Sequence, residues 1–260
     1  MRAELLIRDQ PHYRRYAFES GLKRLGYTIG PIVDPTPNDV FVSWNLYSGR
    51  KTRANQFKAA GAKVLVAENG YYGKDNEDRQ YYALARDGHN GSGKWYTGDE
   101  DRLSHFNIYF KAWREEGKYI LVCPQRGIGP PDFAMPKSWP DEIVAQLKKM
   151  TTLPIKLRPH PGNKPAEIPL SEDLKDAARL VVWSSNSSIA ALIEGIPTYF
   201  CAPHIVTEGA CLSFNNHQGV ERSVFNDGRT SAFHRMSWAQ WSVEELENGF
   251  PFEYLLKEVK

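Results

Sequence analysis

The sequence predicts an α/β fold made of two Rossmann-like domains, with parallel sheets and a cleft between the domains. Short apolar runs alternate with segments of helical periodicity, which favours parallel strands joined by helices that cover both faces of a sheet. This series begins twice, because the charged residues 115–118 separate two runs of the same pattern. We therefore expect domains at residues 1–116 and 117–260. A C-terminal helix at residues 238–248 could pack back on the first domain.

The expected elements of the first domain follow from its apolar runs and from the residues that start or end helices. Pro11 suits the first turn of a helix, and Gly61 stands where a helix commonly ends. Residues 87–98 are rich in glycine and polar side chains, which predicts either a simple connection or a lid that orders on binding. We expect strands at residues 5–7, 40–42, 63–67 and 81–85, and helices at residues 11–25, 50–60 and 99–110.

The second domain repeats the alternation of strands and helices. Ser138 is a plausible cap for one helix, and Gly195 and Pro197 close another. We expect strands at residues 119–123, 155–157, 180–182 and 198–201, and helices at residues 140–150 and 187–194.

The composition is that of an ordinary globular protein and excludes several classes. Of the 260 residues, 41% are hydrophobic and 25% are charged. The apolar runs are far shorter than the about 20 residues of a membrane span, and the first residues carry no signal core, so we expect a cytoplasmic protein. Cys123, Cys201 and Cys211 lie in or beside expected strands, which predicts buried free thiols.

The most informative stretch is residues 181–197, where an apolar strand leads through the serine-rich turn 184–188 into a short helix. Hydroxyl groups and free backbone N–H groups at the start of a helix can hold a phosphate. A serine-rich turn is also a common helix cap that binds nothing. Arg158 and His160 end the preceding strand, and neighbouring parallel strands end at one crevice. We therefore predict that these segments together hold the phosphate of a nucleotide.

A third polar segment, residues 123–129, follows the first strand of the second domain. Its glycines allow close backbone approach, and Arg126 can make a bidentate contact with a phosphate. The spacing matches neither a dinucleotide-binding fingerprint nor a P-loop. Positive charge here would stabilise a phosphate leaving group. The donor-binding residues that these segments predict are Gln125, Arg126, Gly127, Arg158, Ser184, Ser185, Asn186, Ser187 and Ser188.

Residues 118–200 resemble the nucleotide-binding half of the GT-B glycosyltransferases. The resemblance is carried by Arg158-Pro-His-Pro, by the Ser184-Ser185 pair and by Glu194-Gly-Ile-Pro. This segment is similar to the capsule Kdo transferases, to sialyltransferases with HP and SS motifs, and to related phage glycosyltransferases. It implies a GT-B-like fold, a donor phosphate held by His160 and the serine pair, with His160 catalytic, and a donor ribose held by Glu194.

A carboxylate just past the expected strand 63–67 is the candidate for acid–base chemistry. A hydroxyl is a poor nucleophile until its proton is withdrawn, so glycosyl transfer needs a base near the acceptor. We predict Glu68 as that base, with Asp87 as a second candidate on the acceptor side. The alternative is a solvated Glu-Asn-Gly turn at the edge of the sheet.

The first part of the chain is basic. Residues 1–63 hold eleven basic and five acidic residues, a balance of +6 in a chain whose net charge is +2. Such a surface attracts a polyanion, or it is simply a solvated helix face. Aromatic side chains lie among these charges, and rings can stack on bases or sugars. The predicted acceptor-binding residues are Trp44, Arg50, Lys51, Arg53 and Asp87.

The resemblance and the site residues together predict a metal-independent glycosyltransferase that uses a nucleotide sugar as co-substrate and needs no cofactor. The basic first half suggests a phage-type enzyme, in the host cytoplasm, that acts on 5-hydroxymethylpyrimidines of duplex DNA. A capsule or lipopolysaccharide-type glycan is the main alternative acceptor. The alternative of another class is a non-catalytic module that binds a nucleotide or a polyanion, which would need no base such as Glu68.

Overall fold

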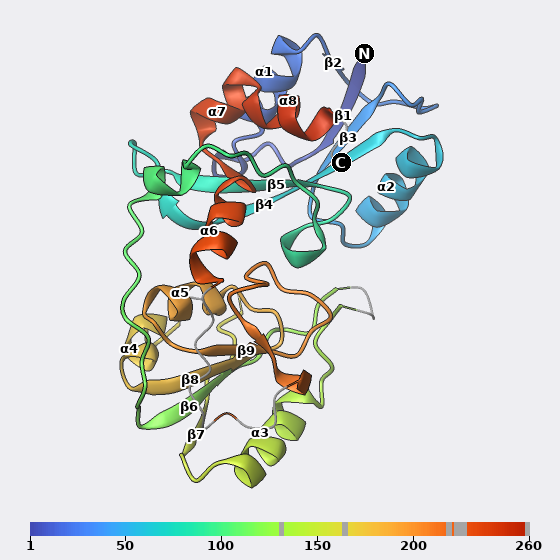
Figure 1. Cartoon of the computed structure of the whole chain (residues 1–260). Coiled ribbons are helices and arrows are strands. Elements are labelled where there is room, and N and C mark those ends of the chain that lie inside the picture. The colour runs from blue at the N-terminus through green and yellow to red at the C-terminus, as the bar shows by residue number, and fades with distance from the viewer. Residues whose placement is uncertain (130–132, 163–165, 217–219, 221–227, 258–260) are drawn as a thin grey trace. The chain divides into compact units, whose positions relative to one another are not determined.

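The computed structural model describes residues 1–129, 133–162, 166–216, 220 and 228–257, and the chain forms two compact units (Figure 1). Unit 1 comprises Met1–Asn107 and His234–Lys260, and unit 2 comprises Ile108–Phe233. The chain therefore passes between the units twice, whereas the sequence suggested a single boundary at residues 116 and 117. No change of composition marks the second passage, near residue 234.

The sheet of unit 1 has the strand order β11-β5-β4-β3-β1-β2. Strands β2, β1, β3 and β4 are parallel, but β5 runs antiparallel to β4, and β11 antiparallel to β5. The expected parallel sheet is thus mixed, because the short link between β4 and β5 suits a hairpin and not a crossover. The strands are β1 (Arg2–Leu6), β2 (Thr28–Ile29), β3 (Val40–Trp44), β4 (Lys63–Lys74), β5 (Gln80–Arg86) and β11 (Gln240–Trp241).

The sheet of unit 2 is parallel throughout, in the order β10-β9-β8-β6-β7. Its central strands β6 and β8 are almost entirely buried, as expected for strands covered on both faces. The strands are β6 (Tyr119–Cys123), β7 (Ile155–Leu157), β8 (Ala177–Val182), β9 (Thr198–Phe200) and β10 (Leu212–Ser213). The helices of this part are α3 (Trp139–Met150), α4 (Leu170–Lys175) and α5 (Ser187–Ile193), while α6 (Arg229–Ser237) contains the return to unit 1.

Two helices of unit 1 are shorter than expected. Arg14, with a φ of +47°, separates the 3-10 turn η1 (Pro11–Tyr13) from α1 (Arg15–Arg24). Of the helix expected at residues 99–110, only the 3-10 turn η3 (Arg102–Phe106) forms. Helix α2 (Gly49–Ala59) matches its expected range within a residue or so, and residues 87–98 hold no regular element beyond the 3-10 turn η2 (Asn90–Ser92).

The C-terminal segment belongs to unit 1. Helix α7 (Val243–Asn248) begins with a capping box between Ser242 and Glu245, and α8 (Phe250–Leu256) follows Gly249. Helix α7 packs so closely on α1 that a Cβ on Gly21 would stand 1.9 Å from the carbonyl oxygen of Leu246. The close approach requires a glycine at that position.

The structure also bears on membrane-spanning helices and on the state of the cysteines. Within the residues that the structure describes, no helix has the length and apolar character needed to cross a bilayer. All three cysteines are free thiols; Cys123 and Cys211 are buried, and Cys201 is partly buried.

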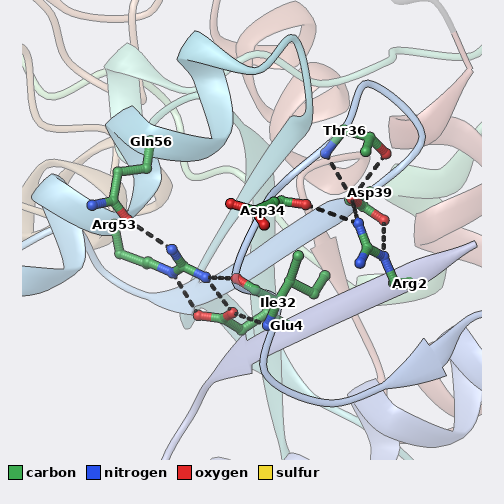
Figure 2. A network of polar contacts seen from close by, with 8 residues as sticks. All are labelled: Arg2, Glu4, Ile32, Asp34, Thr36, Asp39, Arg53 and Gln56. Atoms are coloured by element: carbon green, nitrogen blue, oxygen red, sulfur yellow. Dashed lines mark hydrogen bonds and ion pairs between the residues drawn. The ribbon is translucent and has the colours of Figure 1, made fainter.

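A network of charged residues ties β1 to the neighbouring loop and helix of unit 1 (Figure 2). Arg2 donates to both carboxylate oxygens of Asp39, at 3.0 and 2.6 Å, and Asp39 also accepts from the backbone and hydroxyl of Thr36. The carboxyl group of Asp39 is almost wholly buried. These hydrogen bonds, with that of Arg2 foremost, lower the pKa of Asp39 to about 2.

We expect the substitution Asp39→Asn to lower the free energy of unfolding at pH 7 by about 1–3 kcal/mol, because it leaves the donors of Arg2 and Thr36 poorly paired. The folded-state pKa lies below the unfolded one, so the stabilisation from Asp39 is present above pH 4 and lost as the pH falls towards 2. Urea unfolding from pH 2 to 7 measures both effects. The exposed Asp34→Asn is the control, and an equal loss there would contradict the assignment.

Candidate functional site

The polar segments of unit 2 meet at the carboxyl edge of its parallel sheet. Strand β6 lies between β7 and β8, so the residues that follow these three strands are neighbours. Gln125 and Arg126 follow β6, His160 follows β7, and the serine-rich turn follows β8. The structure thus brings together three segments that are far apart in the sequence.

Gln125 joins two of these segments. Its Oε1 accepts hydrogen bonds from the backbone N–H of Ser184 at 3.2 Å and from the Ser184 hydroxyl at 3.1 Å. The loop that carries Gln125 is itself fixed, since Gly127 has a φ of +66° and a Cβ there would stand 2.8 Å from the carbonyl oxygen of Met135. Gln125 therefore positions the serine-rich turn, and Gly127 is needed for the shape of its loop.

The five residues of the serine-rich turn have different surroundings. The hydroxyl of Ser185 accepts from the backbone N–H of Ser187 at 3.2 Å and from its hydroxyl at 3.0 Å. Asn186 is exposed at the start of α5. Ser188 is fully buried, and its oxygen accepts from the hydroxyl of Thr207 at 3.1 Å. Ser188 thus stabilises the core and offers no atom to a ligand, contrary to its predicted role.

Arg158 does not point a free guanidinium at a phosphate, as we had expected. It forms an ion pair with the buried Asp173 and donates to the carbonyl oxygen of Ile168 at 2.8 Å. Asp173 is also paired with Lys156 at 2.6 Å. Removing Arg158 would therefore leave a buried carboxylate with one partner fewer, so its first role is structural.

His160 is exposed and held in one tautomer. Its Nδ1 accepts a hydrogen bond from the backbone N–H of Gly162 at 2.9 Å, so the neutral ring carries its proton on Nε2. Partial burial and the positive charge of Arg126 lower the pKa of His160. At neutral pH this histidine is an N–H donor and not a cation. The positive charge at this edge comes from the exposed Arg126.

Glu194 lies at the far end of α5 from the serine-rich turn, as its C-cap residue. Its carboxylate pairs with Lys111 at 2.5 Å. The structure thus places the predicted ribose contact about seven residues of helix away from the predicted phosphate contacts, roughly 10 Å at 1.5 Å per residue.

In unit 1, Glu68 lies inside β4 and not past its end, because β4 continues to Lys74 as one arm of a hairpin. Its position at the edge of the parallel part of the sheet is nevertheless as expected. The pairing of β3 with β4 ends at Trp44 and Ala67, and Glu68 is the next residue. Its direct cross-strand partner on β5 is the small residue Ala83.

Burial raises the pKa of Glu68 to about 7, against the opposing effects of the Asn69 backbone N–H and of the Arg50 charge. A base is most effective when its pKa lies near the working pH. No sequence pattern pointed to Tyr71, whose own pKa is raised by burial and by the charge of Glu68. Strict alternation would put residues 68 and 71 on opposite faces, but the register of β4 is irregular after Asn69.

The predicted acceptor residues differ in how they are held. Trp44 is buried in the core of unit 1, where its ring packs edge-on against Tyr13 at 4.7 Å, so it offers little surface to an acceptor. Arg53 is bound in the network of Figure 2, where it donates to both oxygens of Glu4 at 2.8 and 2.7 Å. These two side chains serve the fold, contrary to the prediction.

The other three acceptor candidates lie at the surface. Arg50 donates to the side chain of Asn45 at 3.0 Å, and the backbone of Asn45 donates to Ala67, next to Glu68. Lys51 is exposed. Asp87 is paired with Lys58 at 3.4 Å and has a φ of +67°. Of these three residues, Arg50 is the one whose charge acts on the pKa of the candidate base Glu68.

The described residues contain no group of histidine, cysteine and carboxylate side chains able to hold a metal ion. An Asp-x-Asp triplet, a pattern that binds metal in some transferases, occurs at residues 99–101. There the side chain of Asp101 accepts from the backbone N–H of Ser104 at 3.3 Å and caps η3.

The comparisons with known proteins rest on structure. No family profile and no characterised protein matches the sequence. The solved structures similar to the chain include two transferase structures of Thermosulfurimonas dismutans KpsC. The beta Kdo 2,7 transferase has a TM-score of 0.57 over 98% of this chain and 99% of that one. The beta Kdo 2,4 transferase has a TM-score of 0.53 over 91% of this chain and 89% of that one. Both are 13% identical to the chain, a likeness that confirms the predicted GT-B-like fold class.

We expect Glu68→Gln to raise the free energy of unfolding at pH 8 by about 1–2 kcal/mol. The folded state keeps the proton of Glu68 up to about pH 7, whereas an unfolded chain releases it near pH 4.5, so the wild-type protein loses stability between these values. The glutamine carries no charge to bury and avoids this loss. Urea unfolding at pH 5 and pH 8 measures the difference.

The control is Glu100→Gln, which removes an exposed carboxylate of the same unit. If both variants gain equally at pH 8, the effect is one of net charge and Glu68 is not desolvated.

Proposed function

We propose that the chain is a glycosyltransferase that moves a sugar from a nucleotide-activated donor to a hydroxyl group of a glycan. The observation that carries the proposal is the meeting of Arg126, His160 and the serine-rich turn at the carboxyl edge of unit 2. Open α/β sheets bind nucleotides at this edge. The fold of the chain, which is similar to structures titled Kdo transferases, supports the same activity.

Unit 2 would bind the donor. The Nε2–H of His160, the hydroxyl of Ser185 and the guanidinium of Arg126 are donors of the kind that hold phosphate oxygens, while the hydroxyl of Ser184 already donates to Gln125. Negative charge grows on the phosphate as the bond to the sugar breaks, and fixed donors stabilise that charge. We propose that the reaction needs no metal ion, because the positive charge of Arg126 can neutralise the phosphate in its place.

Unit 1 would supply the base. The ionised carboxylate of Glu68 would accept the proton of the acceptor hydroxyl as the new bond forms. Arg50 favours the ionised form, so it would keep the base available near neutral pH. A module that only binds nucleotides has no need of a desolvated carboxylate, which favours an enzyme over that alternative.

A glycan acceptor, of the capsule or lipopolysaccharide type, is favoured over DNA. Two structures similar to this chain are titled as transferases of the sugar Kdo, and neither title points to a DNA acceptor. The DNA hypothesis rested on the basic residues 1–63. Several of these charges are neutralised internally, since Arg2, Arg15 and Arg53 are paired with Asp39, Glu19 and Glu4.

Donor binding is the direct test of unit 2. We expect a nucleotide sugar at 100 times its dissociation constant to stabilise the wild-type protein by about 2.7 kcal/mol. His160→Ala should weaken its affinity and slow turnover by roughly 10²-fold, because a fixed donor to the phosphate is lost. His160→Gln should recover part of both, since its amide can replace the Nε2–H donor. Thermal unfolding against a panel of nucleotide sugars measures binding.

Lys149→Gln is the matched control, because it removes an exposed cation at the end of α3. If no nucleotide sugar stabilises the wild-type protein, the donor assignment fails. Unchanged kinetics in the folded His160→Ala variant would remove His160 from the reaction.

The base is tested by the pH dependence of transfer. Glu68→Gln should retain the affinity for the donor and lose roughly 10²–10⁴-fold in kcat. In the wild-type protein the rate should rise through about pH 7, since the base must be deprotonated. Arg50→Gln should move this rise to higher pH, because the charge that lowers the pKa of Glu68 is gone.

Transfer is measured with oligosaccharides and with hydroxymethylated duplex DNA in parallel. Product on DNA alone would restore the DNA acceptor, and full activity in Glu68→Gln would place the base elsewhere.

A further inference from the structure

Unit 1 contains a pocket that includes none of the residues discussed so far as donor or acceptor contacts. It has a volume of about 250 Å³ and lies beside the end of the β4–β5 hairpin, η3 and the start of α7. Pockets for drug-sized ligands measure about 300–1,000 Å³. This one therefore suits a single small ring and is too small for a nucleotide.

Two sets of ion pairs lie in the lining of the pocket. Arg79 pairs with Asp75 at 2.8 Å and with Glu77 at 2.9 Å. Arg102 pairs with both oxygens of Glu245. The pocket is thus lined by oriented carboxylates and guanidinium groups.

Arg102 is also held by residues that do not line the pocket. It donates to the carbonyl oxygens of Ser237 at 2.7 Å and of Gln240 at 3.0 Å, and its guanidinium stacks on the ring of Trp241 at 4.3 Å. Glu245 is held by the capping box of α7. A wall whose charges are already oriented binds hydroxyl groups at little cost in entropy.

Two aromatic rings also belong to the lining. Tyr81 and Phe106 both line the pocket, with their ring centroids 4.8 Å apart. An aromatic face suits the C–H face of a sugar ring, or a cation, because the ring carries negative charge on its face. Aromatic rings beside oriented polar groups favour a sugar over a purely apolar ligand.

The charge of the pocket selects among sugars. Its lining holds four carboxylates, those of Asp75, Glu77, Glu244 and Glu245, against the two guanidinium groups and the exposed His105. The surplus is negative, which disfavours phosphates and acidic sugars and favours a ring with a positive charge. Glu244 lies at the exposed start of α7, where a ligand can reach it.

We propose that this pocket binds one amino sugar residue, with the ammonium group near Glu244 and the ring against Tyr81. The proposal rests on the proposed function only in identifying that residue as part of the acceptor glycan. Binding of the free sugar is independent of transfer.

The test is the binding of three monosaccharides at pH 7, measured by saturation-transfer NMR and by calorimetry on the full chain. Glucosamine carries a mostly protonated amine, N-acetylglucosamine is neutral and glucuronate is anionic. We expect affinity to fall in that order. Glu244→Gln should weaken glucosamine by about two- to fivefold and leave N-acetylglucosamine unchanged, because only the charged amine loses an ionic partner. Tyr81→Ala should weaken both.

Glu247→Gln on the same helix is the matched control, since Glu247 does not line the pocket. The proposal is overturned if the wild-type protein binds none of the three sugars, if glucuronate binds as well as glucosamine, or if the control loses as much affinity as Glu244→Gln. Stabilisation by a nucleotide sugar is measured on the same samples. A protein that binds its donor but no amino sugar disproves this proposal alone, and one that binds glucosamine but no donor disproves only the proposed function.

Discussion

Parallel pairing of β6 with both β7 and β8 is the constraint on which the candidate donor site depends. Parallel strands end at the same edge, so the residues after β6, β7 and β8 become neighbours although up to about sixty positions separate them. Arg126 lowers the pKa of His160 across this edge, and Gln125 holds Ser184 there. If β7 were paired elsewhere, the same side chains would have no common site.

The features that the sequence predicted well are those set by local pattern. Strand β6 occurs at its expected residues, and β7 and α3 match within one residue, because apolar runs and helix caps are readable in short windows. The hairpin of β4 and β5 was missed for a related reason. Only the first residues of β4 form an apolar run. Beyond them, Glu68, Asn69 and Lys74 pair with β5, and the backbone of residues 71 and 72 bonds to Gln240, contacts that no local pattern reveals.

The arginines were the least predictable part of the site. The sequence predicted Arg53 as an acceptor contact and Arg158 as a phosphate contact. Each is instead bound to a carboxylate, Arg53 to Glu4 at a separation of 49 residues and Arg158 to Asp173 at 15. Burying a carboxylate costs free energy unless the carboxylate is paired. The nearest guanidinium therefore forms an ion pair with it and is no longer available to a ligand. The partner is chosen by the fold, and sequence alone could not distinguish Arg126 from these two.

The catalytic role proposed for Glu68 would conflict with the stability of the fold. Burial beside β5 raises the pKa of its carboxyl group, which costs folding free energy at neutral pH. The charge of Arg50 offsets part of that cost, while its guanidinium donates to the side chain of Asn45 at 3.0 Å. The pKa of Glu68 stays raised in spite of this charge. A desolvated, incompletely neutralised carboxylate with a pKa near 7 is the state that proton transfer requires.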